Sequence, residues 1–128
     1  MPIRFLSLAR VLRIHRSCIE MYGGDPAVRD MGLLESALGQ PRASFGGQYL
    51  HEDIAAMAAA YLFHIVSNHP FVDGNKRTGA GAAFVFLRMN DVKVTADEQE
   101  FENVTLQVAQ GKISKEVVAE FFRQNIRA

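Results

Sequence analysis

The centre of this 128-residue chain is specified by two adjoining segments, Glu52–Asn68 (EDIAAMAAAYLFHIVSN) and the loop His69–Arg77 (HPFVDGNKR). Ala, Met, Leu and Ile dominate the first stretch, and a helix that is apolar nearly all round belongs in the middle of a bundle. Pro70 disfavours helical backbone at the residue before it, so we expect the helix to end at about Asn68.

A second apolar segment, from about Asn75 to Asn90, predicts the partner of that helix. Gly79 and Gly81 lower its helix propensity, but they permit close contact between helices. The sequence therefore predicts two packed central helices joined by one short loop.

Four more helices are expected around this pair, in a single domain that spans residues 1–128. The first covers 5–22, and its apolar stripe consists of Leu8, Val11, Leu12, His15, Ile19 and Tyr22. Asp30 is the expected N-cap of a short second helix. Thr95 and Glu98 fit a capping box that starts another helix. Ser114 caps the last one, whose expected core face is Val117, Val118, Phe121, Phe122 and Ile126.

Strand is scarce in this all-α prediction of about six helices. Pro41–Tyr49 contains Gly46 and Gly47 and is predicted to be a loop or a small hairpin. Asp91–Thr95 alternates like a strand, but it is too short to found a sheet alone.

The charge balance argues against some functions. The chain has 14 Lys and Arg and 14 Asp and Glu, so its formal net charge is zero. This argues against the broad basic field that non-specific nucleic-acid binding needs, so we expect no direct DNA binding, and any nucleic-acid role would have to be local. No stretch reaches the ~18 uninterrupted apolar residues of a membrane span, and the N-terminus lacks the features of a signal peptide.

A lone cysteine, Cys18, excludes an internal disulfide and a multi-cysteine zinc site. This cysteine usage is typical of a reducing compartment, so we expect a cytoplasmic protein with an inert, buried thiol. His64 is expected to be a core or boundary residue, and His51-Glu52-Asp53 to be the start of a helix.

The loop between the central helices carries the candidate chemistry. The helix that begins near Asn75 presents unpaired backbone N–H groups and a positive dipole end, which suit phosphate oxygens. Lys76 and Arg77 add two positive charges at the end of a helix where cations cost stability. Such a conflict between sequence and helix physics is typical of a functional site.

The other loop residues offer distinct roles. His69 can take a proton from a hydroxyl at neutral pH, and Asp73 offers oxygen ligands to Mg²⁺. Asn75 can cap the helix or donate to phosphate. Phe71 is a candidate anchor in the core, while Pro70 and Gly74 shape the backbone. Together they suit phosphate-ester transfer, although the same residues also fit a plain helix stop, turn and helix start.

The loop resembles the signature of the Fic/Doc superfamily, and Lys76, in place of a second glycine, resembles its Doc branch. The blocks Tyr22–Gly24, Arg29–Asp30 and Gly32–Leu38 resemble the Doc N-terminal region. With Phe86-Leu87 and Asn90, the resemblance covers roughly residues 15–122.

The resemblance implies an all-helical Fic fold, ATP with Mg²⁺, and a protein hydroxyl as acceptor. His69 would be the general base, Asp73 the Mg²⁺ or phosphate-positioning carboxylate, and Gly74, Asn75, Lys76 and Arg77 the nucleotide-phosphate site. Pro41–Tyr49 would be the flap that aligns the target segment.

The type of transfer and the partners are also implied by the resemblance. Fic adenylyltransferases usually carry Gly at the place of Lys76 and Arg at the place of Ala80. Doc-like proteins with the present pattern resemble kinases that phosphorylate a threonine of elongation factor Tu and halt translation. No self-inhibitory Ser/Thr-x-x-x-Glu-Gly/Asn segment occurs, so a Phd-type antitoxin is the expected inhibitor.

Alternatives and departures accompany this hypothesis. The alternatives are AMP transfer and a non-catalytic module that binds an antitoxin, the ribosome or an elongation factor. Doc relatives often have a basic residue before Tyr-Gly-Gly, where this chain has Met21, and one can occur where it has Ser67.

Overall fold

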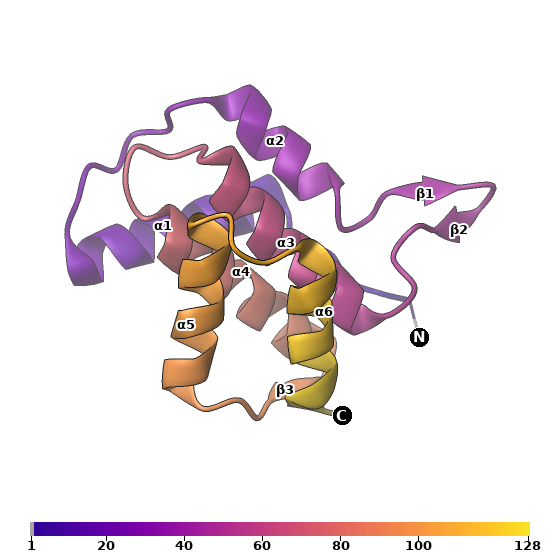
Figure 1. The fold of residues 1–128 in the computed structure, drawn as a ribbon. Coiled ribbons are helices and arrows are strands. Elements are labelled where there is room, and N and C mark those ends of the chain that lie inside the picture. The colour runs from indigo at the N-terminus through magenta and orange to yellow at the C-terminus, as the bar shows by residue number, and fades with distance from the viewer. Residues whose placement is uncertain (1) are drawn as a thin grey trace.

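A computed structural model describes residues 2–128, and six helices lie within them, as the sequence predicts. The helices are α1 (Leu8–Tyr22), α2 (Met31–Gly39), α3 (Ile54–Asn68), α4 (Asn75–Met89), α5 (Glu98–Ala109) and α6 (Lys115–Gln124). The strands are β1 (Ser44–Phe45), β2 (Gln48–Tyr49), β3 (Lys93–Val94) and β4 (Ile126–Arg127). The prediction of an all-α bundle is confirmed (Figure 1).

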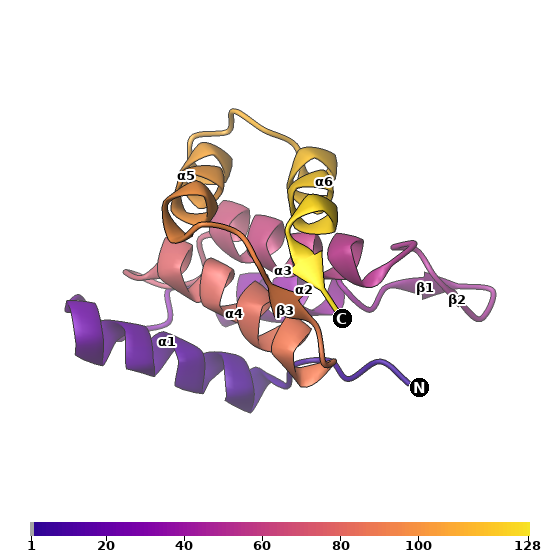
Figure 2. The ribbon, with the colours of Figure 1, turned by 90° about the horizontal axis from the view of Figure 1, so that it is seen from below.

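Helix α3 is the centre of the bundle. It packs against α2, α4, α5 and α6, and ten of its residues are buried. In Figure 2, α1 forms one outer edge of the molecule, α5 and α6 form the opposite edge, and α3 and α4 lie between them. The sequence placed this central helix correctly because its residues are apolar on every side.

The close approach of α4 to α3 depends on Gly79. A Cβ atom at Gly79 would lie 2.7 Å from Cγ2 of Val66 and 3.2 Å from the backbone oxygen of Leu62. At Gly81 a Cβ would lie 3.1 Å from Cγ2 of Ile14 on α1. The predicted role of both glycines in tight packing is therefore confirmed.

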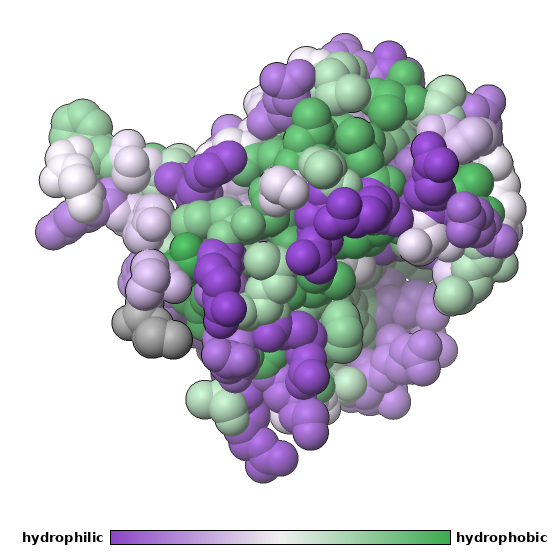
Figure 3. Space-filling view, turned by 180° about the vertical axis from the view of Figure 1, so that it is seen from behind, coloured by the Kyte–Doolittle hydropathy of each residue, from purple (hydrophilic) through white to green (hydrophobic). Residues whose placement is uncertain are grey.

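The segment Pro41–Tyr49 contains a small antiparallel hairpin in which Ser44 pairs with Tyr49 and Phe45 with Gln48. Gly46 and Gly47 both have positive φ, which the tight turn requires. The hairpin stands out from the body of the molecule in Figures 1 and 3. The ring of Tyr49 packs on Phe5 with 5.5 Å between centroids, whereas Phe45 is 83% exposed.

The capping-box prediction at Thr95 is wrong. Helix α5 begins at Glu98 after Asp97, which makes no side-chain cap hydrogen bond. The backbone N–H of Thr95 instead donates to the carbonyl of Asn125 at 2.7 Å. Strands β3 and β4 pair just beside this bond, so tertiary pairing keeps Thr95 extended.

The predicted core face of the last helix, α6, is also partly wrong. Val118 and Phe122 are fully buried, but Val117 is half exposed and Ile126 lies in β4, beyond the end of the helix. The N-caps predicted at Asp30 and Ser114 are confirmed, since each side chain accepts a backbone N–H of its helix. Within residues 2–128 no helix has the length and apolar character that a bilayer crossing requires.

Candidate active site

The loop between α3 and α4 turns through two residues with left-handed backbone. His69, which follows α3, has φ 52° and ψ 53°, and Gly74, the N-cap of α4, has φ 83°. Histidine tolerates this conformation better than most residues, and glycine adopts it without cost. The chain therefore leaves one helix and enters the next within a few residues, with the imidazole of His69 exposed.

Asn75 organises this loop from within. It is 5% exposed, its Oδ1 accepts the backbone N–H of Phe71 at 2.9 Å, and its Nδ2 donates to the carbonyl of Phe71 at 2.9 Å. The same Nδ2 lies 3.1 Å from Nδ1 of His69. All its amide groups are thus engaged inside the loop, which leaves only the backbone N–H of Asn75 for a ligand.

The predicted anchor, Phe71, is fully buried. Its ring stacks on His15 of α1 with centroids 3.7 Å apart and planes 8° apart. His15 is itself 3% exposed, and its Nε2 lies 2.9 Å from the carbonyl oxygen of Asp73. The sequence placed His15 in the apolar stripe of α1 but did not predict this contact, and a polar ring in that stripe was the one signal that could have pointed to it.

The segment before α2 braces the other side of the loop. The carbonyl of Pro70 accepts the N–H groups of Arg29 and Asp30 at 2.7 and 3.0 Å, and the N–H of Val72 donates to Ala27 at 3.1 Å. The guanidinium of Arg29 donates to the carbonyls of His69 at 2.7 Å and of the last residue of α3 at 3.1 Å. Arg29 therefore stabilises the C-terminus of α3. Like the contact of His15, this role was not predicted from the sequence.

An open cavity of about 370 Å³ lies at the N-terminus of α4. Its lining residues are Cys18, Tyr22, Gly23, Gly24, Asp73, Gly74, Lys76 and Arg77. Within residues 2–128 the backbone N–H groups of Asn75, Lys76 and Arg77 have no protein acceptor, and the first turn has no acidic side chain. The guanidinium carbon of Arg77 sits 3.9 Å from the centre of the Tyr22 ring. Free amides and two cations thus face one cavity, an arrangement suited to anions.

Comparisons with known proteins show the family of this chain. The model of the Fic/DOC family matches residues 5–87. A protein named protein kinase doc, from Escherichia phage P1, is 34% identical over 122 residues, which cover 95% of each chain. This chain belongs to the Fic/DOC family. A protein named toxin Doc, from Mycolicibacterium smegmatis, is 43% identical over 76 residues, 59% of this chain and 58% of that one.

In this Fic/DOC protein, Asp73 lies at the edge of the cavity. Its Oδ2 accepts the backbone N–H of Asp25 at 2.7 Å, and its Oδ1 has no partner among the described residues. Gly24 makes this possible, because a Cβ there would lie 2.9 Å from the Cβ of Asp73. Mg²⁺ usually binds one or two protein carboxylates together with substrate phosphates, so one free carboxylate oxygen fits it. Among residues 2–128, no three His, Cys, Asp or Glu side chains form a metal cluster.

Three residues differ from the sequence-based expectation or from the Doc-like pattern, and of these Cys18 alone lines the cavity. Cys18 is half-buried and lines the cavity, so the prediction of a buried thiol is wrong. Met21, where Doc relatives often have a cation, is 73% exposed. Ser67, the other departure, is exposed on α3.

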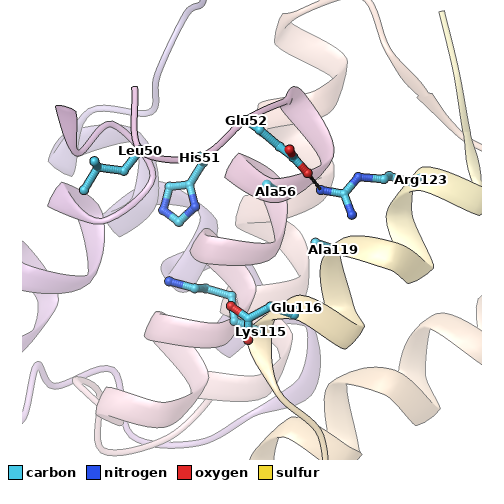
Figure 4. A pocket seen from close by; sticks show the side chains of 8 residues that line it. All are labelled: Leu50, His51, Glu52, Ala56, Lys115, Glu116, Ala119 and Arg123. Carbon is cyan, nitrogen blue, oxygen red and sulfur yellow. Dashed lines mark hydrogen bonds and ion pairs between the residues drawn. The ribbon is translucent and has the colours of Figure 1, made fainter. Parts of the chain in front are cut away.

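A second cavity of about 270 Å³ in this Fic/DOC protein contains no residue of the loop. It lies between the start of α3 and α6, where Arg123 forms an ion pair with Glu52 (Figure 4). Arg123 also forms an ion pair with Asp53. His51 lines it, and its Nε2 donates to the carbonyl of Gln40 at 3.0 Å, at the base of the hairpin.

His64 lies near this second cavity and is half-buried, as the sequence predicts. Its Nε2 accepts a hydrogen bond of 3.3 Å from Nζ of Lys115. Burial, followed by the charge of Lys115, lowers the pKa of His64 to about 4. His64 is therefore neutral at pH 7, and it does not line the cavity at the N-terminus of α4.

Proposed function

We propose that this protein is a Doc-like toxin that transfers the γ-phosphoryl group of ATP to a hydroxyl of a translation factor. One observation carries the proposal: Asn75 contacts the exposed imidazole of His69 with its side chain and contributes its backbone N–H to the anion site. Its side chain orients His69, and its backbone N–H is the first of the unpartnered amides at the cavity. The name of one relative, a protein kinase, supports phosphoryl transfer, and the name of the other, a toxin, supports the toxin role.

Each residue of the loop has a separate role in the proposed reaction. Lys76, Arg77 and the amides at the start of α4 bind the phosphates and stabilise the charge that develops during transfer. His69 takes the proton of the acceptor hydroxyl as that oxygen attacks the γ-phosphorus, and ADP leaves with the electrons of the broken P–O bond. Asp73 would hold Mg²⁺, which supplies further positive charge when bound.

Proton transfer sets a requirement on His69. Nε2 is the ring nitrogen without a partner within the described residues, so it faces the acceptor hydroxyl. To accept a proton there, the neutral ring must carry its own proton on Nδ1. Because Asn75 donates to Nδ1 in the resting site, the ring has to change to the tautomer with its proton on Nδ1, and Nδ1 has to lose the hydrogen bond from Asn75, before proton transfer.

The acceptor and the inhibitor form the finer part of this proposal. A threonine of elongation factor Tu is the proposed acceptor, and modification of that factor would arrest translation. A Phd-like antitoxin is the proposed inhibitor, because one relative is named a toxin and this chain contains no self-inhibitory segment. An antitoxin tail that folds on binding suits reversible control.

Incubation with ATP labelled at the γ or the α position tests the reaction. Label from γ-labelled ATP should enter elongation factor Tu, and its mass should rise by one phosphate group. An AMP-sized addition would instead assign adenylyl transfer, and no addition with intact growth arrest would assign a binding module. His69→Asn is the matched variant, because Asn also tolerates left-handed backbone. It should lose about 10²-fold or more in rate while its melting temperature is kept.

A further inference from the structure

The contact between His15 and the loop fixes the direction of a peptide group. A carbonyl oxygen only accepts hydrogen bonds, so Nε2 of His15 must carry the proton in its 2.9 Å contact with Asp73. The ring cannot slide away, because it is stacked on the buried Phe71. The carbonyl of Asp73 is therefore held toward α1.

The same peptide group includes the N–H of Gly74. All peptide bonds in the described chain are trans, and in a trans peptide the C=O and the N–H point in opposite directions. With the Asp73 carbonyl turned toward His15, the Gly74 N–H is turned away from it. This N–H has no acceptor within residues 2–128, and Gly74 lines the phosphate cavity.

Because residue 74 is glycine, the backbone alone does not fix the orientation of this peptide group. Gly74 has φ 83°, and a residue without Cβ populates positive and negative φ about equally. The Asp73–Gly74 peptide can therefore rotate at little local cost. After such a rotation the carbonyl oxygen of Asp73 would face the side that the N–H now faces, where its partial negative charge would repel an anion.

We propose that His15 is a positioning residue, which holds the Asp73–Gly74 peptide so that the Gly74 N–H joins the anion site at the start of α4. His15 itself touches no substrate. This inference rests on the proposed function only in naming the anion as the phosphates of a nucleotide.

Two variants of His15 separate its hydrogen bond from its stacking. His15→Phe keeps an aromatic ring against Phe71 but lacks the donor. His15→Gln loses the ring but can place an amide N–H where Nε2 was. His64→Phe is the matched control, since it replaces a half-buried histidine that does not contact the loop. All three variants are compared with the wild type at equal folded fraction.

Calorimetric titration with ATP and with pyrophosphate gives the first readout. His15→Phe should bind both ligands about fivefold more weakly or worse, the size expected when one hydrogen bond is lost. His15→Gln and His64→Phe should bind as the wild type does. Equal affinity in folded His15→Phe and wild type would overturn the proposal, and so would equal losses in the Phe and Gln variants.

The amide resonance of Gly74 gives a second readout that needs no ligand. Its chemical shift and its exchange with water should change in His15→Phe and return in His15→Gln. If the wild type binds neither ATP nor pyrophosphate, the proposed function fails. The Gly74 resonance then tests the positioning role of His15 without a ligand. An unchanged Gly74 amide in His15→Phe would then overturn the positioning role.

Discussion

Nδ2 of Asn75 lies 3.1 Å from Nδ1 of His69, so the first residue of α4 orients the imidazole that follows the last residue of α3. The two bonds from Asn75 to the backbone of Phe71 fix which end of its amide is nitrogen. Nδ1 of His69 is therefore the acceptor in the resting site, and the proton of the neutral ring is on Nε2.

Nitrogen NMR of the imidazole should show this tautomer directly. In the free protein at a pH where the ring is neutral, the Nε2 signal of His69 should have the shift of a protonated nitrogen. Asn75→Ala removes the donor and should move the ring toward a mixture of the two neutral forms. A free protein with Nδ1 protonated would contradict the assignment.

Asn75→Ala should also destabilise the protein. It leaves the N–H and the carbonyl of the buried Phe71 without partners, which should cost at least about 2 kcal/mol in the free energy of unfolding. Urea denaturation gives this value. Asn103→Ala on α5, where the side chain is exposed and accepts one bond from Gln99, is the control and should stay within about 0.5 kcal/mol.

Gly79→Ala should lower the free energy of unfolding by about 1–3 kcal/mol, because the new methyl group would push α3 and α4 apart. Its closest contacts would be the side chain of Val66 and the backbone of Leu62. Gly39→Ala, at the end of α2 with nothing within 4 Å, should be neutral or slightly stabilising. A Gly79→Ala protein as stable as the wild type would show that the helices can part without cost.

Stability should fall as the pH drops from about 6.5 to about 4. The pKa of His64 is lowered to about 4, mainly by burial. The unfolded chain takes up a proton near pH 6.5 that the folded chain takes up only near pH 4, so acid favours unfolding across this window. Burial and Lys115 lower the pKa of His51 in the same direction.

Urea midpoints measured across this pH range check the effect. His64→Gln should flatten the dependence, because it removes the titrating ring. Asp53→Asn is the contrasting variant: the hydrogen bond from Arg123 lowers the pKa of Asp53, so its contribution is present above about pH 4 and is lost as the pH falls further. An unaltered slope in His64→Gln would assign the acid sensitivity to other groups.

Phe45 lies on β1, in the segment Pro41–Tyr49 that we propose to be the flap. It should therefore affect the binding of the protein acceptor and not the binding of ATP. Phe45→Asp should raise the KM for the acceptor about tenfold, because it removes an apolar contact and adds a charge. ATP affinity and the melting temperature should stay the same, since Phe45 is 83% exposed. Steady-state kinetics with each substrate varied separates the two, and an unchanged acceptor KM would remove Phe45 from target alignment.

Several parts of the fold could be predicted from the sequence because they depend on residues that are neighbours in the chain. The apolar content of Glu52–Asn68 was enough to predict a central helix, because burial on all sides requires it. The caps at Asp30 and Ser114 followed from bonds that span three residues. The position of the loop between α3 and α4 was also predicted, since Pro70 disfavours helical backbone at the residue before it.

The contacts that hold this loop join residues that lie far apart in the chain. His15 and Asp73 are 58 positions apart in the chain, and Arg29 and His69 are 40 apart. No local pattern encodes such pairs, because they meet only after α1 packs on α4 and the 27–30 segment pairs with the loop. The same reason explains the error at Thr95, whose backbone bonds to Asn125 and not to its own helix.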